Sequence, residues 1–271
     1  MKKKIRLFWW NEKKLMGKSK ENYGDLMGKY LAEKISGKKV VWAHPKKKKL
    51  KNLFSPIYVT IGSILANVTS NCIVWGSGII SKEYPVKRAA FLAVRGPYTR
   101  EFLLDSGYDV PEVYGDPALL LPDYYNPKLE KKYKLAVVPH YNDYKALEEQ
   151  YKSEKDILII DLMTDDIEAT TDLFLQSERV ISSSLHGLIV AHAYGIPAIW
   201  TPFSDKLFGD GIKFKDYFAS VDIPYYQMPI QKKKMTLADI DVLFREHPSL
   251  VELEKIKQLR VDLMEVCPFK G

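Results

Sequence analysis

Short apolar runs alternate with segments of helical periodicity along most of the chain. Several runs, such as residues 135–138 and 198–200, are continuous rather than alternating, as is typical of strands buried on both faces of a sheet. Helical segments separate many of them, which favours parallel strands joined by helices. The predicted strands cover residues 5–9, 58–61, 72–75, 91–94, 112–114, 135–138, 157–160, 179–181 and 198–200. The pattern therefore predicts an α/β fold with a mainly parallel sheet.

Three segments carry the spacing and end signals of helices. Residues 26–35 place apolar side chains on one face and stop before Gly37, and residues 97–105 begin with a proline and stop before Gly107. Proline at the start and glycine after the end are typical helix boundaries. Apolar residues recur near helical spacing from 250 to 266, which predicts a long C-terminal amphipathic helix.

The pattern breaks at residues 121–127, where two prolines interrupt it before a new set of strands begins. An interruption of this kind between two sets of elements is typical of a domain boundary. A chain of 271 residues can form one large domain or two of ordinary size. We place the boundary after residue 126, which predicts domains at 1–126 and 127–271.

Composition narrows the class of protein. With 46% hydrophobic and 28% charged residues the chain is not disordered, and its two cysteines exclude a disulfide framework. The five histidines form no pair at zinc spacing, so no metal is expected. The first apolar run is short and lacks a signal-peptide cleavage site, and no run approaches the roughly 20 apolar residues of a membrane span. We therefore expect a cytoplasmic protein.

The formal net charge is +7, and much of the excess lies in lysine runs at residues 2–4, 46–51 and 232–234. Clustered lysines attract nucleic acid, anionic lipid or a phosphorylated substrate. They are equally typical of a solvated surface, so charge alone does not choose a partner.

The sharpest candidate site is the serine turn that follows the strand at 179–181. Ser183 or Ser184 is expected to cap the next helix, whose N-terminal N–H groups and dipole then favour an anion. His186 lies in the first turn of that helix, where an imidazole can donate to a phosphate or carboxylate or move a proton. The alternative is that His186 only caps the turn. His192 is expected to pack in the core.

Other candidates also follow strands, where open α/β sheets bind ligands. Arg95 can hold an anion with its guanidinium or form a salt bridge between domains. Asp25 is either a helix cap or a carboxylate facing a sugar hydroxyl, and Gly24 permits a close ligand approach. The turn at residues 75–78 is glycine-rich, but neither a dinucleotide fingerprint nor a Walker A motif occurs. Hydride transfer from NAD and P-loop phosphoryl transfer are therefore disfavoured.

Taken in order, five segments resemble the polysaccharide pyruvyl transferase family: Asn22-Tyr-Gly-Asp25, Trp75-Gly-Ser-Gly78, Val94-Arg-Gly-Pro-Tyr-Thr99, Tyr114-Gly-Asp-Pro-Ala-Leu-Leu120, and Ser182-Ser-Ser-Leu-His-Gly187 through Pro197. The resemblance spans about residues 5 to 200 and implies two Rossmann-like domains facing across a cleft, as in GT-B glycosyltransferases. It also implies transfer of the pyruvyl group of phosphoenolpyruvate to sugar hydroxyls as a cyclic ketal. Many members carry arginine where this chain has Ser184, so one expected anion contact is missing.

The resemblance gives the candidate residues their expected roles. His186 is the acid or the phosphate partner, Arg95 clamps the donor, and Asp25 is a base or orients the acceptor. Asp116 is expected to cap the turn before Pro117. The residues expected to contact substrate are Asn22, Gly24, Gly76, Ser77, Gly78, His140, Ser183, Ser184 and Leu185.

The expected donor is phosphoenolpyruvate, with no further cofactor. The expected acceptor is a sugar of a capsular or exopolysaccharide intermediate on a lipid pyrophosphate, met peripherally at the inner, anionic face of the cell membrane. No nucleic acid partner is expected, and the oligomeric state stays open. Two alternatives remain: a GT-B glycosyltransferase that uses a nucleotide sugar, and a noncatalytic glycan-binding protein of the same pathway.

Overall fold

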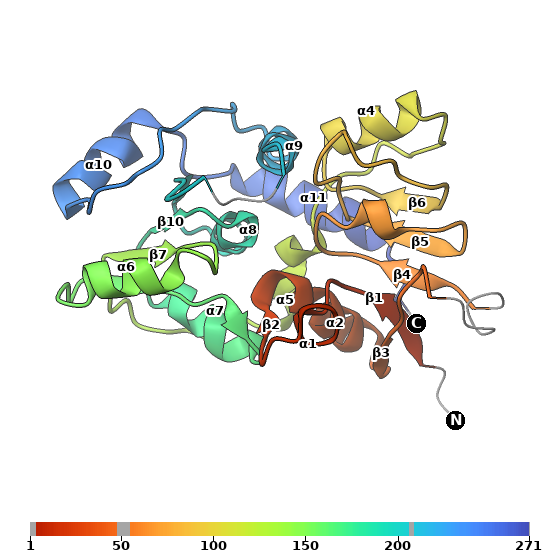
Figure 1. Cartoon of the computed structure of the whole chain (residues 1–271), viewed down its shortest axis with the longest axis horizontal. Coiled ribbons are helices and arrows are strands. Elements are labelled where there is room, and N and C mark those ends of the chain that lie inside the picture. The colour runs from red at the N-terminus through yellow and green to blue at the C-terminus, as the bar shows by residue number, and fades with distance from the viewer. Residues whose placement is uncertain (1–3, 48–54, 206–208, 271) are drawn as a thin grey trace.

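The computed structural model describes residues 4–47, 55–205 and 209–270, with helices around and between two parallel sheets (Figure 1). The first sheet has the order β3 (Val40–Trp42), β1 (Ile5–Phe8), β4 (Ile57–Val59), β5 (Cys72–Trp75) and β6 (Ala90–Ala93). The second has the order β11 (Ala198–Trp200), β10 (Val180–Ser182), β7 (Leu135–Val138) and β8 (Ile157–Ile159). Neighbouring strands in both sheets run parallel, which confirms the predicted α/β class.

The α-helices are α1 (Glu12–Met16), α2 (Tyr23–Ser36), α4 (Pro97–Asp105), α5 (Leu121–Tyr124), α6 (Tyr144–Tyr151), α7 (Ile167–Leu175), α8 (Leu185–Ala193), α9 (Ile212–Ser220), α10 (Leu237–Glu246) and α11 (Leu253–Glu265). α-Helices connect the neighbouring strands of the second sheet along the chain, and α1 and α2 connect β1 to β3 in the first, as is usual for parallel strands. Two short 3₁₀ turns are η1 (Leu65–Asn67) and η2 (Pro117–Leu120). An antiparallel pair, β2 (Glu21–Asn22) with β9 (Met163–Thr164), joins the two halves of the chain.

Most predicted strands agree with the structure to within one or two residues at each end. The predicted strand at 112–114 is wrong, because only Tyr114 pairs, in a single bridge to Val94. β2, β3 and β9 were not predicted, since runs of two or three residues carry no periodicity. In the C-terminal segment Ile256, Leu259 and Leu263 are buried, whereas Leu250 and Leu253 are exposed, so the apolar face is shorter than the sequence indicates.

The largest buried cluster draws on both halves of the chain. It packs Met27 of α2 and Leu119 of η2 with Val138 of the second sheet and Leu188 of α8. The C-terminal helix α11 also returns to the first sheet, where Trp75 Nε1 donates a hydrogen bond to the Leu263 carbonyl at 2.9 Å. The boundary after residue 126 stays a prediction, and the elements on its two sides share a core.

A buried ion pair fixes helix α9 to the first sheet. Arg95 Nε lies 2.9 Å from Asp216 Oδ2, and neither side chain has any exposed surface. The same carboxylate accepts hydrogen bonds from Thr99 N at 2.8 Å and Thr99 Oγ1 at 2.7 Å, so it caps the N-terminus of α4 from another helix. Gly96 makes this approach possible, because a Cβ there would lie 2.1 Å from the Asp216 carbonyl oxygen.

We predict that Asp216→Asn lowers the free energy of unfolding by about 3–5 kcal/mol, because removal of one partner leaves the Arg95 charge buried and unpaired. Urea unfolding followed by tryptophan fluorescence measures the loss. The control is Asp241→Asn, which breaks the partly exposed pair with Arg179 and is expected to cost less than about 1 kcal/mol. Equal losses in the two variants would contradict the role given to the buried pair.

Candidate functional site

The serine turn after β10 presents the N-terminus of α8. Ser184 occupies the N-cap position, but its side chain makes no capping hydrogen bond. Ser183 does not cap the helix either, because its Oγ accepts a hydrogen bond from His140 N at 2.8 Å. The predicted capping by these serines is therefore wrong, and no side chain of residues 4–47, 55–205 or 209–270 caps the first N–H groups of α8. A helix end of this kind favours an anion.

His186, in the first turn of α8, faces Asp116, which precedes the 3₁₀ turn η2. His186 Nε2 lies 3.6 Å from Asp116 Oδ2, and the two side chains are 13% and 1% exposed. Neither atom has a hydrogen-bond partner among the described residues. Asp116 Oδ1 accepts from Ala118 N at 2.9 Å, which confirms the predicted cap before Pro117. Its second oxygen, Oδ2, faces the imidazole, and the sequence alone does not predict this pairing of Asp116 with His186.

Two glycines allow this arrangement. A Cβ on Gly24, in the first turn of α2, would lie 1.9 Å from His186 Nδ1, so only glycine lets the imidazole lie against that backbone. Gly76 has φ +86°, and a Cβ there would lie 2.2 Å from Pro117 Cδ. The loop that carries Asp116 can therefore settle on the end of β5. The group that lies against Gly24 is the chain's own His186, and the predicted approach of a ligand there stays a prediction.

Asp25 lies inside the first turn of α2 and does not cap it. The cap is Asn22, whose side chain accepts from Gly24 N at 3.0 Å. Burial raises the pKa of Asp25 well above its ordinary value, and the negative charges of Glu12, Glu21 and Asp116 raise it further, against the opposing effect of Lys213. Asp25 therefore keeps its proton to higher pH than a surface carboxyl group does.

Lys213, in the first turn of α9, supplies a positive charge that sequence reasoning missed. Burial lowers its pKa to about 8, with a further decrease from Arg95 and an opposing effect from Asp25. Its charge also acts on His140, whose pKa falls to about 4, mainly because of burial. Lys213 is thus electrostatically coupled to groups from both halves of the chain. It is one of 41 basic residues, and only the packing of α9 distinguishes it.

Arg95 does not lie where a donor clamp is expected. Besides Asp216, its guanidinium donates to Ser63 Oγ at 2.6 Å and to the Ile79 carbonyl at 2.8 Å. It also packs on Gly78, where a Cβ would lie 2.3 Å from Cζ. The structure supports the alternative interpretation, a salt bridge between the two halves of the chain. As placed, Arg95 has no exposed surface with which to contact a substrate.

Several other predicted contact residues have internal partners. Ser77 is fully buried and donates to the Gly62 carbonyl at 2.7 Å, and Leu185 is part of the core. His140 follows β7 beside Ser183, as expected for a residue after a strand. His192 is buried, with Nδ1 2.9 Å from the Tyr217 hydroxyl, which confirms its predicted packing in the core.

Within the described ranges, no three His, Cys, Asp or Glu side chains are grouped so that they could hold a metal ion. In the same part of the chain, no helix has the length and apolarity needed to cross a membrane.

Comparison with known proteins identifies the family of the chain. The family model for polysaccharide pyruvyl transferase matches residues 22–204, a range that contains Gly24, Asp116 and His186. An uncharacterized protein of Acanthamoeba polyphaga mimivirus is 35% identical over 207 residues, which cover 73% of this chain and 70% of that protein. The chain belongs to the polysaccharide pyruvyl transferase family.

Proposed function

We propose that this protein transfers the pyruvyl group of phosphoenolpyruvate to a sugar of a capsular or exopolysaccharide intermediate, with formation of a cyclic ketal and release of phosphate. The observation that carries the proposal is the His186–Asp116 pair at an uncapped helix N-terminus. An acid–base group beside an anion site is what transfer from an anionic donor requires.

The donor carries a phosphate and a carboxylate on a three-carbon skeleton. The N-terminus of α8 suits one of these anionic groups, and Lys213 suits the other. Lys213 then supplies the positive charge that many relatives are expected to supply with arginine at the position of Ser184. Lys213 replaces Arg95 as the residue that we propose to bind the anion, because the Arg95 guanidinium is paired with Asp216.

The chemistry needs one group that gives a proton and one that takes it. We exchange the roles expected from the sequence, because burial raises the pKa of Asp25 and so favours its protonated form. Asp25 gives its proton to the methylene carbon of the donor, and the adjacent carbon becomes cationic. A sugar hydroxyl attacks that carbon while His186 removes the hydroxyl proton, and Asp116 stabilises the imidazolium that forms. The carbon–oxygen bond to phosphate breaks, and phosphate leaves with the proton from His186. A second hydroxyl closes the ketal and returns its proton to Asp25.

We predict that His186→Ala lowers turnover about 10²- to 10⁴-fold in a folded protein, the usual contribution of a general acid or base. Gly24→Ala is expected to give a similar loss, because the added methyl group displaces the imidazole. Phosphate release from phosphoenolpyruvate and the mass increase of a glycan acceptor measure turnover.

The matched control for Gly24→Ala is Gly28→Ala in the same helix. Its Cβ would lie 2.6 Å from Thr60 Oγ1 and does not approach His186. Near-native turnover in His186→Ala would refute the catalytic role of the imidazole. Transfer from a nucleotide sugar, without consumption of phosphoenolpyruvate, would favour the glycosyltransferase alternative.

We predict that phosphoenolpyruvate binds more weakly as pH rises through about 8, because Lys213 then loses its proton and its charge. The phosphate is already fully ionised above pH 7, so the donor contributes little to this change. Isothermal titration between pH 7 and 9.5 measures the effect.

Lys213→Met is expected to abolish this pH dependence and to weaken binding at pH 7 by about 10- to 100-fold, the value of a charge-assisted hydrogen bond. Lys215→Met, two residues further along α9, is the control and is expected to bind the donor normally. Unchanged affinity in Lys213→Met would remove Lys213 from the donor site.

Contact with the membrane follows from the lipid-linked acceptor that we propose. Lys46 and Lys47 are exposed, as are Lys232 to Lys234, while Lys2, Lys3, Lys48, Lys49 and Lys51 lie outside the described residues. Each lysine near an anionic surface contributes about 1 kcal/mol, within a Debye length of roughly 8 Å.

We predict that the protein sediments with anionic vesicles at low salt and dissociates from them at high salt. Replacement of Lys46 to Lys49 by serine is expected to reduce sedimentation and to leave turnover on a soluble acceptor unchanged. Equal partitioning onto neutral and anionic vesicles would eliminate the membrane contact without affecting the catalytic proposal.

A further inference from the structure

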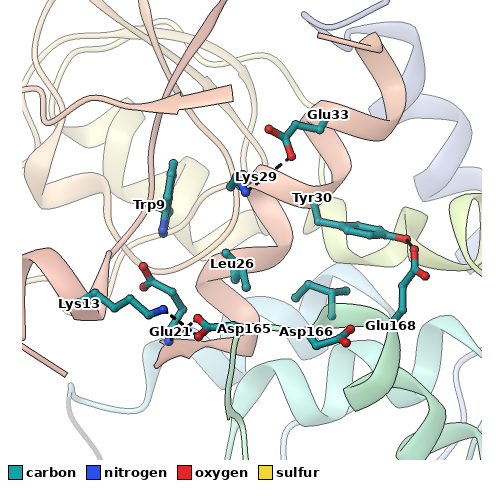
Figure 2. A pocket seen from close by; sticks show the side chains of 11 residues that line it. Trp9, Lys13, Glu21, Leu26, Lys29, Tyr30, Glu33, Asp165, Asp166 and Glu168 are labelled. Carbon is teal, nitrogen blue, oxygen red and sulfur yellow. Dashed lines mark hydrogen bonds and ion pairs between the residues drawn. The ribbon is translucent and has the colours of Figure 1, made fainter. Parts of the chain in front are cut away.

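A pocket, called here the α2 pocket, lies on the face of α2 away from His186, with a volume of about 590 Å³ (Figure 2). Helix α2 forms one wall, and the start of α7 with the residues around β2 and β9 forms the other. This volume falls within the range of about 300–1,000 Å³ that is typical of small-molecule sites. None of the reaction groups His186, Asp116 and Lys213 lines it.

Two partly exposed ion pairs line the pocket and supply both hydrogen-bond donors and acceptors. Lys13 Nζ lies 2.7 Å from Asp165 Oδ2, and Lys29 Nζ lies 3.7 Å from Glu33 Oε2. All four side chains are partly exposed, with 35–52% of their surface accessible. Each can therefore form a further hydrogen bond to a ligand in the pocket.

Trp9 contributes a donor with no acceptor. The residue is 5% exposed, and its indole Nε1 has no hydrogen-bond partner among the described residues. Figure 2 shows the nitrogen edge of the ring turned toward the end of the pocket where Glu21 and Lys13 lie. Both Glu21 oxygens already accept hydrogen bonds, from Asn11 and from Glu12 N. A buried donor without a partner is rare in proteins, so a ligand oxygen here would satisfy it.

An apolar strip separates the polar groups of the rim. Leu26 and Ile167 face the pocket from opposite walls. The hydroxyl of Tyr30 donates to Glu168 Oε1 at 2.6 Å, which fixes the ring beside Leu26 (Figure 2). The lining of the pocket thus includes aliphatic and aromatic side chains as well as hydrogen-bond donors and acceptors.

We propose that this pocket binds a sugar unit of a neutral glycan, and so holds the acceptor chain at a distance from the reacting sugar. A sugar has hydroxyl groups that both donate and accept, together with apolar C–H faces, and it can use every group described above. A simple cation would use the carboxylates alone and leave Trp9 without a partner. An anion would be repelled, because carboxylates outnumber lysines in the lining.

The position of the pocket connects it to the proposed reaction. Gly24 of α2 lies against His186, whereas Lys29 and Tyr30 line the pocket more than one turn further along the helix. A glycan longer than one sugar could extend from one site to the other around the start of α2. The inference as an acceptor site rests on the proposed function, but glycan binding itself can be measured without it.

The test measures binding without phosphoenolpyruvate. The probes are neutral β-linked oligosaccharides of glucose, galactose or N-acetylglucosamine with two to six units, followed by saturation-transfer NMR and calorimetry. We expect at least one series to bind, and Trp9→Phe to weaken it about 3- to 10-fold through loss of one hydrogen bond. Asp165→Asn is expected to weaken the same series.

Trp200→Phe is the matched control. It also removes a buried indole N–H that has no hydrogen-bond partner in the described part of the chain, but Trp200 lies in β11 and does not line the pocket. Thermal unfolding of each variant checks that the fold is retained. Absence of binding by every series, an equal loss in Trp200→Phe, or preferential binding of a lysine-rich peptide would overturn the proposal.

Turnover separates this inference from the proposed function. If the protein transfers pyruvate, Trp9→Phe is expected to raise the KM for a hexasaccharide acceptor and to leave kcat and the KM for phosphoenolpyruvate unchanged. Glycan binding without any phosphate release would refute the proposed reaction and support the pocket. Phosphate release with no effect of Trp9→Phe on the acceptor KM would support the proposed reaction and refute the pocket as an acceptor site.

Discussion

The arrangement of the site depends on the buried ion pair between Arg95 and Asp216. Two charges without exposed surface are expensive to remove from water, and only good geometry with additional hydrogen bonds offsets that cost. Asp216 meets this condition because it accepts hydrogen bonds from Arg95 and from two donors of Thr99. The pair fixes α9 against α4, and Lys213 lies on α9 almost one turn before Asp216. The location of the Lys213 charge therefore follows from a contact between two fully buried side chains.

Helix α2 is the second element on which the site depends. Its buried face packs Met27 and Leu31 into the core shared by both halves of the chain, and its first turn lies against His186. Because Gly24 has no side chain, the imidazole can lie directly on the backbone and turn Nε2 toward Asp116. The antiparallel pair of β2 and β9 fixes the start of this helix to the second half. One helix thus relates the reaction groups to the pocket on its other face.

The two regions differ in charge in a way that fits their proposed ligands. We propose that the anionic donor binds at Lys213 and the N-terminus of α8, which both favour negative charge. The α2 pocket, in contrast, is lined by more carboxylates than lysines. Burial in the first region raises the pKa of Asp25 and lowers that of Lys213, so each loses part of its preference for the charged form. Such opposite shifts suit groups that exchange a proton or bind an anion.

The sequence by itself determined the fold class and the order of the motifs. Continuous apolar runs predict buried parallel strands, and the helix at Pro97–Asp105 is bounded by a proline and a glycine. His186 could be identified because it follows a strand and a serine turn. Only the tertiary structure decided the surroundings of Arg95, Asp116 and Lys213, because each depends on groups distant in the chain. Arg95 and Asp216 are 121 residues apart, and no local periodicity encodes their contact. Packing of α9 against α4 buries Arg95, the residue expected to hold the substrate, in an internal ion pair, and it places the charge of Lys213 close enough to Asp25 to act on its pKa.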